Sequence, residues 1–327
     1  EARLAYNLQD VRVSLAAEIA SAYVNVRRYA AQVDIAEANL ALQERNAATI
    51  RARFEVGEVA RYDLVAAEAQ MAATRASIPS LQQSLTASQL DLDWLTGNVP
   101  YATQARLMET MDNMALPDLS PKLMPNDLLR RRADIRMAEE DVHAQTAAIG
   151  VAEAELYPRF TLNGTLGISS PDLTPWPDYA QTVSFGPAVS WNIFGFGTWR
   201  KQVESAKATL EAVLADYRDT VLDAYREAET AWIACQREAE RTADLRAAER
   251  NNASALEIAN QRYEIGTISI DDVLTRQSSL LSAQENLVTH RATLFTNAIT
   301  LYRALGGGWA DEPRTDADAD AGAEAAQ

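Results

Sequence analysis

A five-residue sequence occurs twice in this chain, first as Arg53-Phe54-Glu55-Val56-Gly57 and then as Arg262-Tyr263-Glu264-Ile265-Gly266. The offset from Gly57 to Gly266 is 209 residues, and it continues without gaps on both sides. The aligned pairs include Asp63 with Asp272 and Gly97 with Gly306. A constant offset over so long a span predicts that the chain contains two copies of one structural unit.

The second half of each copy has an apolar residue at every seventh position. In the first copy these residues are Leu64, Met71, Ile78, Leu85 and Leu92. In the second copy they are Val273, Leu280, Leu287, Leu294 and Leu301. This spacing is typical of a long α-helix whose apolar stripe packs against neighbouring helices.

A glycine ends the helix that precedes each stripe. Gly57 and Gly266 can adopt the left-handed backbone that terminates a helix, and a second helix is expected about three residues later. In the second copy Ser269 is suited to cap the new helix, and Asp272 can act as the acidic partner of a capping box. Each copy is therefore predicted to be a long helical hairpin with a tight tip.

The helix before Gly266 is predicted to run from about Thr198 to Tyr263. Its apolar residues alternate at spacings of four and three, as in coiled coils. They are Leu210, Leu214, Tyr217, Val221, Ala224, Ala228, Ala231 and Cys235. At a rise of 1.5 Å per residue this helix would be on the order of 100 Å long. Such helices are typical of coiled coils and barrel staves, and not of compact enzymes.

Between the two copies the apolar period changes to two residues, which predicts a pair of β-strands. The apolar positions are Phe160, Leu162 and Leu166 in the first run, and Val183, Phe185, Pro187, Val189, Trp191 and Ile193 in the second. The opposite face is small or polar, as in strands of a transmembrane barrel. A soluble hairpin packed on the helices is the alternative, and the weak signal of each strand favours it. The edges of a lone hairpin must pair, however, so strands from neighbouring subunits are the better explanation.

Charge and composition exclude several classes of function. The net charge of −16 leaves no basic stripe for nucleic acid. The single cysteine, Cys235, rules out an internal disulfide framework and is expected to be buried packing. His143 and His290 have no partner at a metal-binding spacing, so we expect no cofactor, no metal and no enzyme activity. The chain has no transmembrane run and opens within a predicted helix, so it is either cytosolic or a processed or truncated segment.

A further stretch makes the chain resemble a known family. Its residues are Asp127-Leu128-Leu129-Arg130-Arg131-Arg132-Ala133-Asp134-Ile135-Arg136, Ala138-Glu139, Ile149-Gly150, Ala152, Ala154 and Tyr157-Pro158. Together with the repeat, the tips and the strand pair, they resemble the TolC-like outer-membrane efflux protein family, especially its lipoprotein branch that serves RND-type multidrug pumps. Ala133 stands where the family typically has a proline. The resemblance covers nearly everything from Leu4 to Gly308.

The resemblance implies a trimer in which each subunit gives four strands to a twelve-stranded transmembrane β-barrel, while long antiparallel helical hairpins form a periplasmic α-barrel. The expected fold is therefore mainly α with a small β part. Only the second strand pair is present, so we expect this sequence to be a fragment that lacks the first pair. The expected division is 1–97, a first helical hairpin that is incomplete at its N-terminus; 98–158, an equatorial segment and helix; 159–197, the β-hairpin of the barrel; 198–308, the second helical hairpin; and 309–327, a disordered acidic tail.

By resemblance, Asp63 and Asp272 match acidic positions that face the lumen near the periplasmic constriction. A threefold ring of carboxylates there would favour cations. The other candidate gate residues are Asp271, Tyr263, Arg53 and Arg262. Helix capping explains the two aspartates equally well, because an acid in the first turn complements the helix dipole. Thr275 and Ile268 replace a second acid and an arginine of the family pattern.

The helical tips are, by resemblance, the sites that meet a periplasmic adaptor (membrane fusion) protein. Their residues are Val56, Gly57, Glu58, Ile265, Gly266 and Thr267. The expected partners are two further copies in a homotrimer, the adaptor, an inner-membrane pump and outer-membrane lipid, without nucleic acid. The implied function is passive conduction of small molecules through the outer membrane of a Gram-negative bacterium, as part of a tripartite efflux system. The alternatives are the duct of a type I protein-secretion machine and, from another class, a soluble coiled-coil scaffold.

Overall fold

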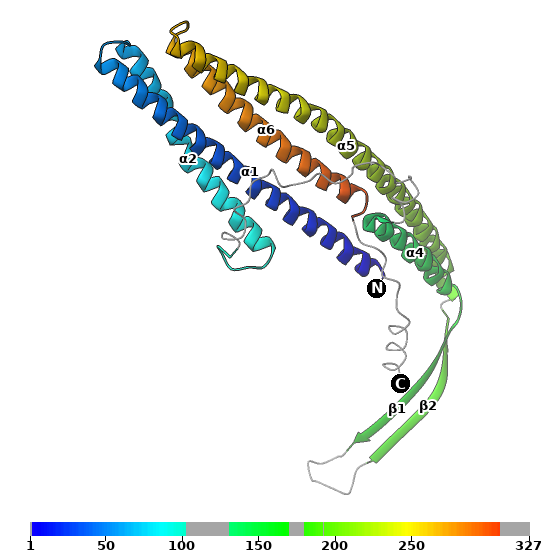
Figure 1. Cartoon of the computed structure of the whole chain (residues 1–327). Helices are drawn as coiled ribbons and strands as arrows, with labels where there is room; N and C mark the ends of the chain where they lie inside the picture. The colour runs from blue at the N-terminus through cyan, green and yellow to red at the C-terminus, as the bar shows by residue number, and fades with distance from the viewer. Residues whose placement is uncertain (1, 103–130, 170–179, 192, 308–327) are drawn as a thin grey trace, which may run out of the picture. The chain divides into compact units, whose positions relative to one another are not determined.

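The computed structural model describes residues 2–102, 131–169, 180–191 and 193–307, and it is mainly helical with one strand pair (Figure 1). The expected fold class is therefore confirmed. The elements are α1 (Ala2–Glu55), α2 (Arg61–Leu95), α4 (Ala133–Ala154), β1 (Arg159–Ser169), β2 (Ala180–Ser190), a short 3-10 helix (Ile193–Gly195), α5 (Phe196–Glu264) and α6 (Ile270–Ala304). Among the described helices, none combines the length and the apolar composition that crossing a membrane requires.

Internal contacts divide the chain into two compact units. The smaller unit comprises Glu1–Asn7 and Asp134–Leu222, and the larger comprises Leu8–Ala133 and Asp223–Gln327. The five-part division expected from the sequence remains a prediction. Its acidic tail, residues 309–327, lies outside the described residues, as does the start of the family stretch at 127–130.

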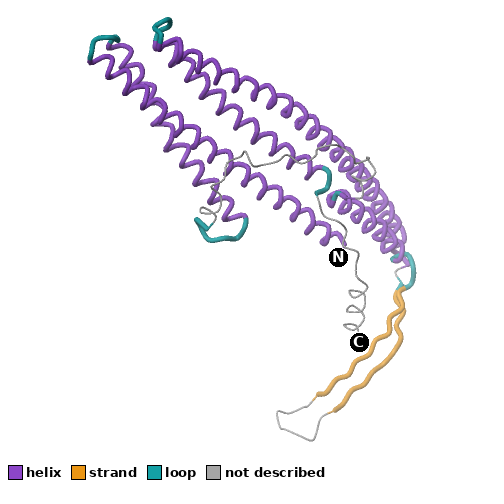
Figure 2. The backbone as a smooth tube through the Cα atoms, in the orientation of Figure 1, coloured by secondary structure: helices purple, strands orange, loops and turns teal. Residues whose placement is uncertain are grey.

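Two helical hairpins supply the helices of the larger unit, as the repeat predicts, although α5 begins in the smaller unit and enters the larger one after Leu222. The first joins α1 to α2 and the second joins α5 to α6, and Figure 2 shows each connecting turn as a short loop. Gly57 has a φ of +79° and Gly266 a φ of +74°, and both amides donate to a carbonyl of the helix they end. Only glycine adopts this backbone without strain. The glycines therefore explain why both helices stop and turn at the same repeat position.

The apolar stripes bury the helices against one another. None of the stripe residues predicted on α2, α5 and α6 is exposed. Near the tips all four helices contribute to one core, the tip cluster, which comprises Ala47, Ile50, Ala67, Leu256, Ala259, Ile270 and Val273. Further from the tips Cys235 packs between α5 and α6 and is 1% exposed, as expected. The two hairpins thus pack against each other within the larger unit.

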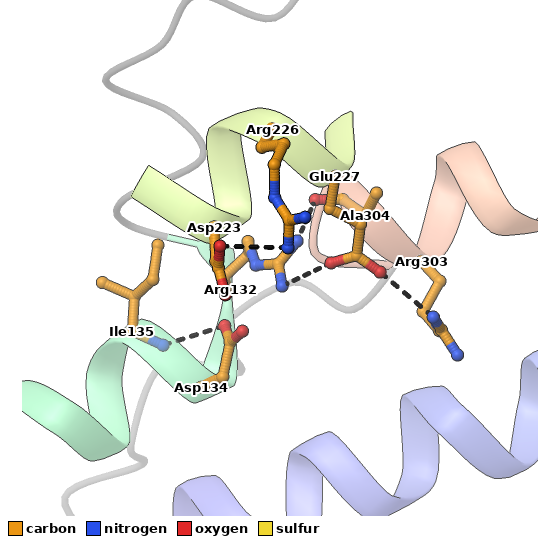
Figure 3. Close-up of polar contacts among 8 residues, drawn as sticks. All are labelled: Arg132, Asp134, Ile135, Asp223, Arg226, Glu227, Arg303 and Ala304. Atoms are coloured by element: carbon orange, nitrogen blue, oxygen red, sulfur yellow. Dashed lines mark hydrogen bonds and ion pairs between the residues drawn. The ribbon is translucent and has the colours of Figure 1, made fainter. Parts of the chain in front are cut away.

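A charged network fixes the far end of α6 (Figure 3). Arg132 donates to the carbonyl oxygen of Ala304 and to Glu227, both at 2.8 Å. Arg303 donates to the other oxygen of Glu227 at 3.0 Å. Burial raises the pKa of Glu227, but the hydrogen bonds and charges of Arg132 and Arg303 outweigh it, so the pKa lies below its ordinary value. One arginine of the family stretch therefore links a helix end to the preceding helix.

The smaller unit contains the β-hairpin. β1 and β2 pair antiparallel, and the register places Phe160 opposite Val189 and Leu166 opposite Val183. The predicted apolar positions of the two strands therefore share one face. The alternating pattern extends to Ile193, but β2 ends at Ser190 and Ile193 lies in the 3-10 helix that leads into α5. The alternating pattern extends beyond the strand because the apolar residues of this connection continue the two-residue period of β2.

Candidate gate and docking surface

The two tips are exposed and partly apolar. Val56 and Ile265 hold the same repeat position, and they are 71% and 74% exposed. Gly57, Glu58, Gly266 and Thr267 are exposed as well. Single exposed apolar residues are common on protein surfaces. Here, however, an exposed apolar side chain occupies the same repeat position at both tips, so the two tips present matching apolar surfaces. The predicted docking residues are therefore accessible, although their contact with an adaptor remains a prediction.

Both predicted gate aspartates cap a helix. Asp63 accepts a hydrogen bond from the backbone nitrogen of Ala60 at 3.1 Å, and Asp272 accepts one from the backbone nitrogen of Ser269 at 3.1 Å. The hydroxyl of Ser269 also donates to Asp272 at 2.8 Å. These bonds from Ser269 hold the pKa of Asp272 below its ordinary value. Capping therefore accounts for the position of each aspartate within its own hairpin.

The other candidates reach from one tip to the other. The guanidinium of Arg53 lies over the ring of Tyr263, 5.1 Å from its centre. The hydroxyl of Tyr62 donates to Asp271 at 3.4 Å. Both contacts join the first hairpin to the second and are part of the larger unit. The structure thus brings together Arg53 with Tyr263, and it adds Tyr62 as the partner of Asp271.

Sequence reasoning missed Tyr62, although a signal was present. Tyr62 and Asp271 are separated by 209 residues, so they hold the same repeat position. Residues at equivalent positions of two packed copies can meet near the axis that relates the copies. Arg262 takes a different role, because its carbonyl accepts from the amide of Thr267 at 2.9 Å and its charge helps to lower the pKa of Asp272. In the described chain no hydrogen bond links Asp63 to Asp272.

The β-hairpin presents a second candidate surface. Its apolar face comprises Phe160, Leu162, Leu166, Val183, Phe185 and Val189, with Trp191 just beyond, and these residues are 52–78% exposed. Pairing involves one edge of each strand, so the outer edges are unpaired within the described sheet. A two-stranded ribbon with a bare apolar face is unstable in water, so this face and these edges require partners.

The described part of the chain gives no candidate metal site. Across the described residues, histidine, cysteine and acidic side chains form no group able to hold a metal ion. His290 lies 2.7 Å from Glu238, so it links α6 to α5. Burial raises the pKa of the Cys235 thiol, which makes it a poor nucleophile.

Comparison with known proteins identifies relatives along most of the chain. The profile of the family described as outer membrane efflux protein matches residues 2–98 and 124–307. Nodulation protein T of Rhizobium leguminosarum bv. trifolii is 31% identical over 303 residues, which are 89% of this chain and 63% of that protein. The probable efflux pump outer membrane protein TtgC of Pseudomonas putida is 28% identical over 305 residues, which are 93% of this chain and 63% of that protein.

The fold also matches a solved structure. The outer-membrane channel OprN superposes with a TM-score of 0.83 at 33% identity, covering 94% of this chain and 69% of that one. The chain spans about 63% of the length of the two curated relatives. The long helical hairpins and the β-hairpin described above are therefore shared with a solved outer-membrane protein.

Proposed function

Because this chain belongs to the outer membrane efflux protein family, we propose that it is the channel subunit of a tripartite efflux system, which conducts small molecules from the periplasm to the exterior. The family consists of outer-membrane proteins of Gram-negative bacteria and not of enzymes. Two relatives are named as outer-membrane proteins of antibiotic and toluene efflux pumps. The cargo of this chain is accordingly proposed to be small and apolar or amphipathic.

The observation that supports this proposal most directly is the bare apolar face of the β-hairpin. Each strand has 11 residues, and about 9–11 tilted residues cross the hydrocarbon layer of a membrane. One face is apolar and the other carries Thr161, Asn163 and Thr165, so the ribbon suits lipid on one side and water on the other. A soluble scaffold would leave this apolar face in water.

A homotrimer would satisfy the unpaired strand edges. A membrane barrel must close so that every strand edge is paired. Two strands cannot close alone, so we propose that residues 159–197 join strands of neighbouring copies and that residues 1–97 and 198–308 form the periplasmic helical tube. The same three copies would bring six tips together at one end of the tube.

The tips would provide the gate and the docking surface. Val56 and Ile265 would contact the periplasmic adaptor, to which the inner-membrane pump also binds. The cross-tip contacts of Tyr62 with Asp271 and of Arg53 with Tyr263 would hold each pair of tips together while the tube is closed. The capping aspartates Asp63 and Asp272 would add negative charge at the constriction and favour cations.

Reconstitution of the full-length protein in planar lipid bilayers tests the proposal. We expect discrete conductance steps and a cation preference, because acidic residues line the tips. The variants Y62F and D271N remove the cross-tip hydrogen bond and keep the shape, and they are expected to increase the open time; Y157F is the matched control outside the tips. Absence of any conductance from correctly inserted trimers would refute the channel function. Unchanged gating and selectivity in Y62F, D271N and D63N/D272N would refute the gate alone.

A further inference from the structure

A row of buried and partly buried polar side chains lies between α1 and α6. We call this row the amide seam; it comprises Gln32, Asn39 and Gln43 of α1 and Gln277, Gln284 and Thr289 of α6. Two hydrogen bonds of 3.2 Å cross it, from Gln32 to Thr289 and from Asn39 to Gln284. The bonded residues of α1 are seven positions apart and thus lie on one face of the helix.

Gln43 and Gln277 occupy the next level of this seam toward the tips. On α1, Gln43 is one turn from Asn39 and one turn from Ala47 of the tip cluster. On α6, Gln277 lies between Val273 of the same cluster and Gln284. Because the two helices run antiparallel, as the bonded pairs require, both glutamines occupy the same level of the interface.

Both glutamines are buried without a hydrogen-bond partner. Gln43 is 3% exposed and Gln277 is fully buried. The amide nitrogen and oxygen of each side chain have no partner among the described residues. Burying such groups is unfavourable, and leucine would fill the same space more stably. These residues are therefore poor choices for stability, which suggests that they serve another purpose.

The equivalent positions in the first hairpin are occupied by charged residues. Glu68 and Arg75 of α2 hold the repeat positions of Gln277 and Gln284, and they form ion pairs with Arg51 and Glu44 of α1. Those pairs are exposed, and exposed pairs contribute little. Within a hairpin the turn at the tip already fixes how the helices align. No turn joins α1 to α6, so this interface lacks that constraint.

An apolar seam with a seven-residue repeat can pack in more than one register. Shifting one helix by seven residues presents the same kind of side chain to its neighbour, and buried polar residues are a known means of excluding the shifted pairing. We propose that the amide seam fixes the register of the second hairpin against the first and so brings the two tips level. A shift of one heptad would move one tip by about 10 Å relative to the other. The contacts of Arg53 with Tyr263 and of Tyr62 with Asp271 could not then form.

This proposal does not depend on the proposed channel function, because it concerns the alignment of two hairpins in one chain. Cross-linking of the full-length protein tests it. In a C235A background, Y62C is combined with D271C or, one heptad further along α6, with S278C. A short bismaleimide then links them, and the mass of the product separates links within a chain from links between chains. The unmodified seam should strongly favour the link to 271.

The variants N39L/Q284L and Q43L/Q277L, alone and combined, remove the amides. We expect the yield of the 271 link relative to the 278 link to fall about fivefold in N39L/Q284L, which removes one hydrogen-bonded rung. The melting temperature of Q43L/Q277L should be unchanged or raised, which a purely stabilising role would not produce. Q83L/Q236L makes the same substitutions at exposed sites of α2 and α5 and should leave the preference intact, as should the exchanged pair N39Q/Q284N. If the combined variant does not accumulate, N39L/Q284L alone gives the comparison, and an undiminished preference for 271 in N39L/Q284L would overturn the proposal.

Discussion

Replacing Arg132 is expected to loosen the second hairpin at the end opposite its tip. The guanidinium makes two hydrogen bonds of 2.8 Å, one to the carbonyl of Ala304 at the end of α6 and one to Glu227 of α5. Its side chain is 11% exposed, whereas that of Glu227 is 33% exposed. In R132M the apolar part of the side chain remains, but the carbonyl of Ala304 loses the guanidinium as its hydrogen-bond donor. The carboxylate of Glu227 retains its hydrogen bond from Arg303. The change therefore isolates the guanidinium from the packing of its stem.

The magnitude follows from the two lost bonds. A hydrogen bond to a charged group contributes about 1.5–3 kcal/mol, and the partial exposure of Glu227 lets water replace part of the second bond. We therefore expect a loss of about 2–4 kcal/mol in the free energy of unfolding. At roughly 2 °C per kcal/mol for a long chain, the melting temperature should fall by about 4–8 °C.

Thermal unfolding of the detergent-purified full-length protein, followed by circular dichroism at a fixed scan rate, measures this change. R226M is the matched control, since Arg226 pairs with Asp223 nearby but both side chains are exposed, at 76% and 60% (Figure 3). That pair should contribute less than about 0.5 kcal/mol. If R132M melts within 1 °C of R226M, the network does not stabilise the helix end and the reasoning above is wrong.

Three further predictions concern neighbouring features. The folded-state pKa of Glu227 is lowered, so the contribution of this carboxylate to the free energy of unfolding is complete above about pH 4.5 and is lost as the pH falls through the folded pKa. The difference in melting temperature between wild type and E227Q should accordingly shrink in acid. G306A should destabilise the fold more than its repeat equivalent G97A. Both glycines have a positive φ, so each substitution should cost about 1–3 kcal/mol of stability through the backbone, but only a Cβ at 306 would lie 2.9 Å from the Cβ of Arg131. Equal melting temperatures of the two variants would contradict the clash. Cys235 should react slowly with a maleimide in the native protein and rapidly in denaturant, because burial covers the thiol and raises its pKa; fast native labelling would show that α5 and α6 open there.

Much of the fold could be predicted from the sequence because the signals are local and repeated. Gly57 and Gly266 mark turns at equal repeat positions, and Ser269 with Asp272 forms the predicted capping box. The helix expected to run from Thr198 to Tyr263 extends from Phe196 to Glu264. Caps, turns and heptads depend on residues a few positions apart, so one sequence is enough to recognise them.

Contacts between elements were harder to predict. The link from Arg132 to Glu227 joins residues 95 positions apart, and the link from His290 to Glu238 joins residues 52 positions apart. Heptad spacing identifies which face of a helix is buried, but it does not specify which polar side chain on another helix lies opposite. The buried glutamines of the amide seam were missed for the same reason, since a polar residue within an apolar stripe resembles an exposed position.

A comparison of the two copies distinguishes residues that make contacts within their own hairpin from residues that contact the other hairpin. Positions that are identical, such as Gly57 with Gly266 and Asp63 with Asp272, form the turn and the cap within a hairpin. Tyr62 and Asp271, which differ, meet across the copies, and Arg53, which is identical to its equivalent Arg262, also contacts Tyr263 of the other copy. A gate variant that alters only Asp63 and Asp272 therefore leaves the cross-tip contacts of Tyr62 and Arg53 intact.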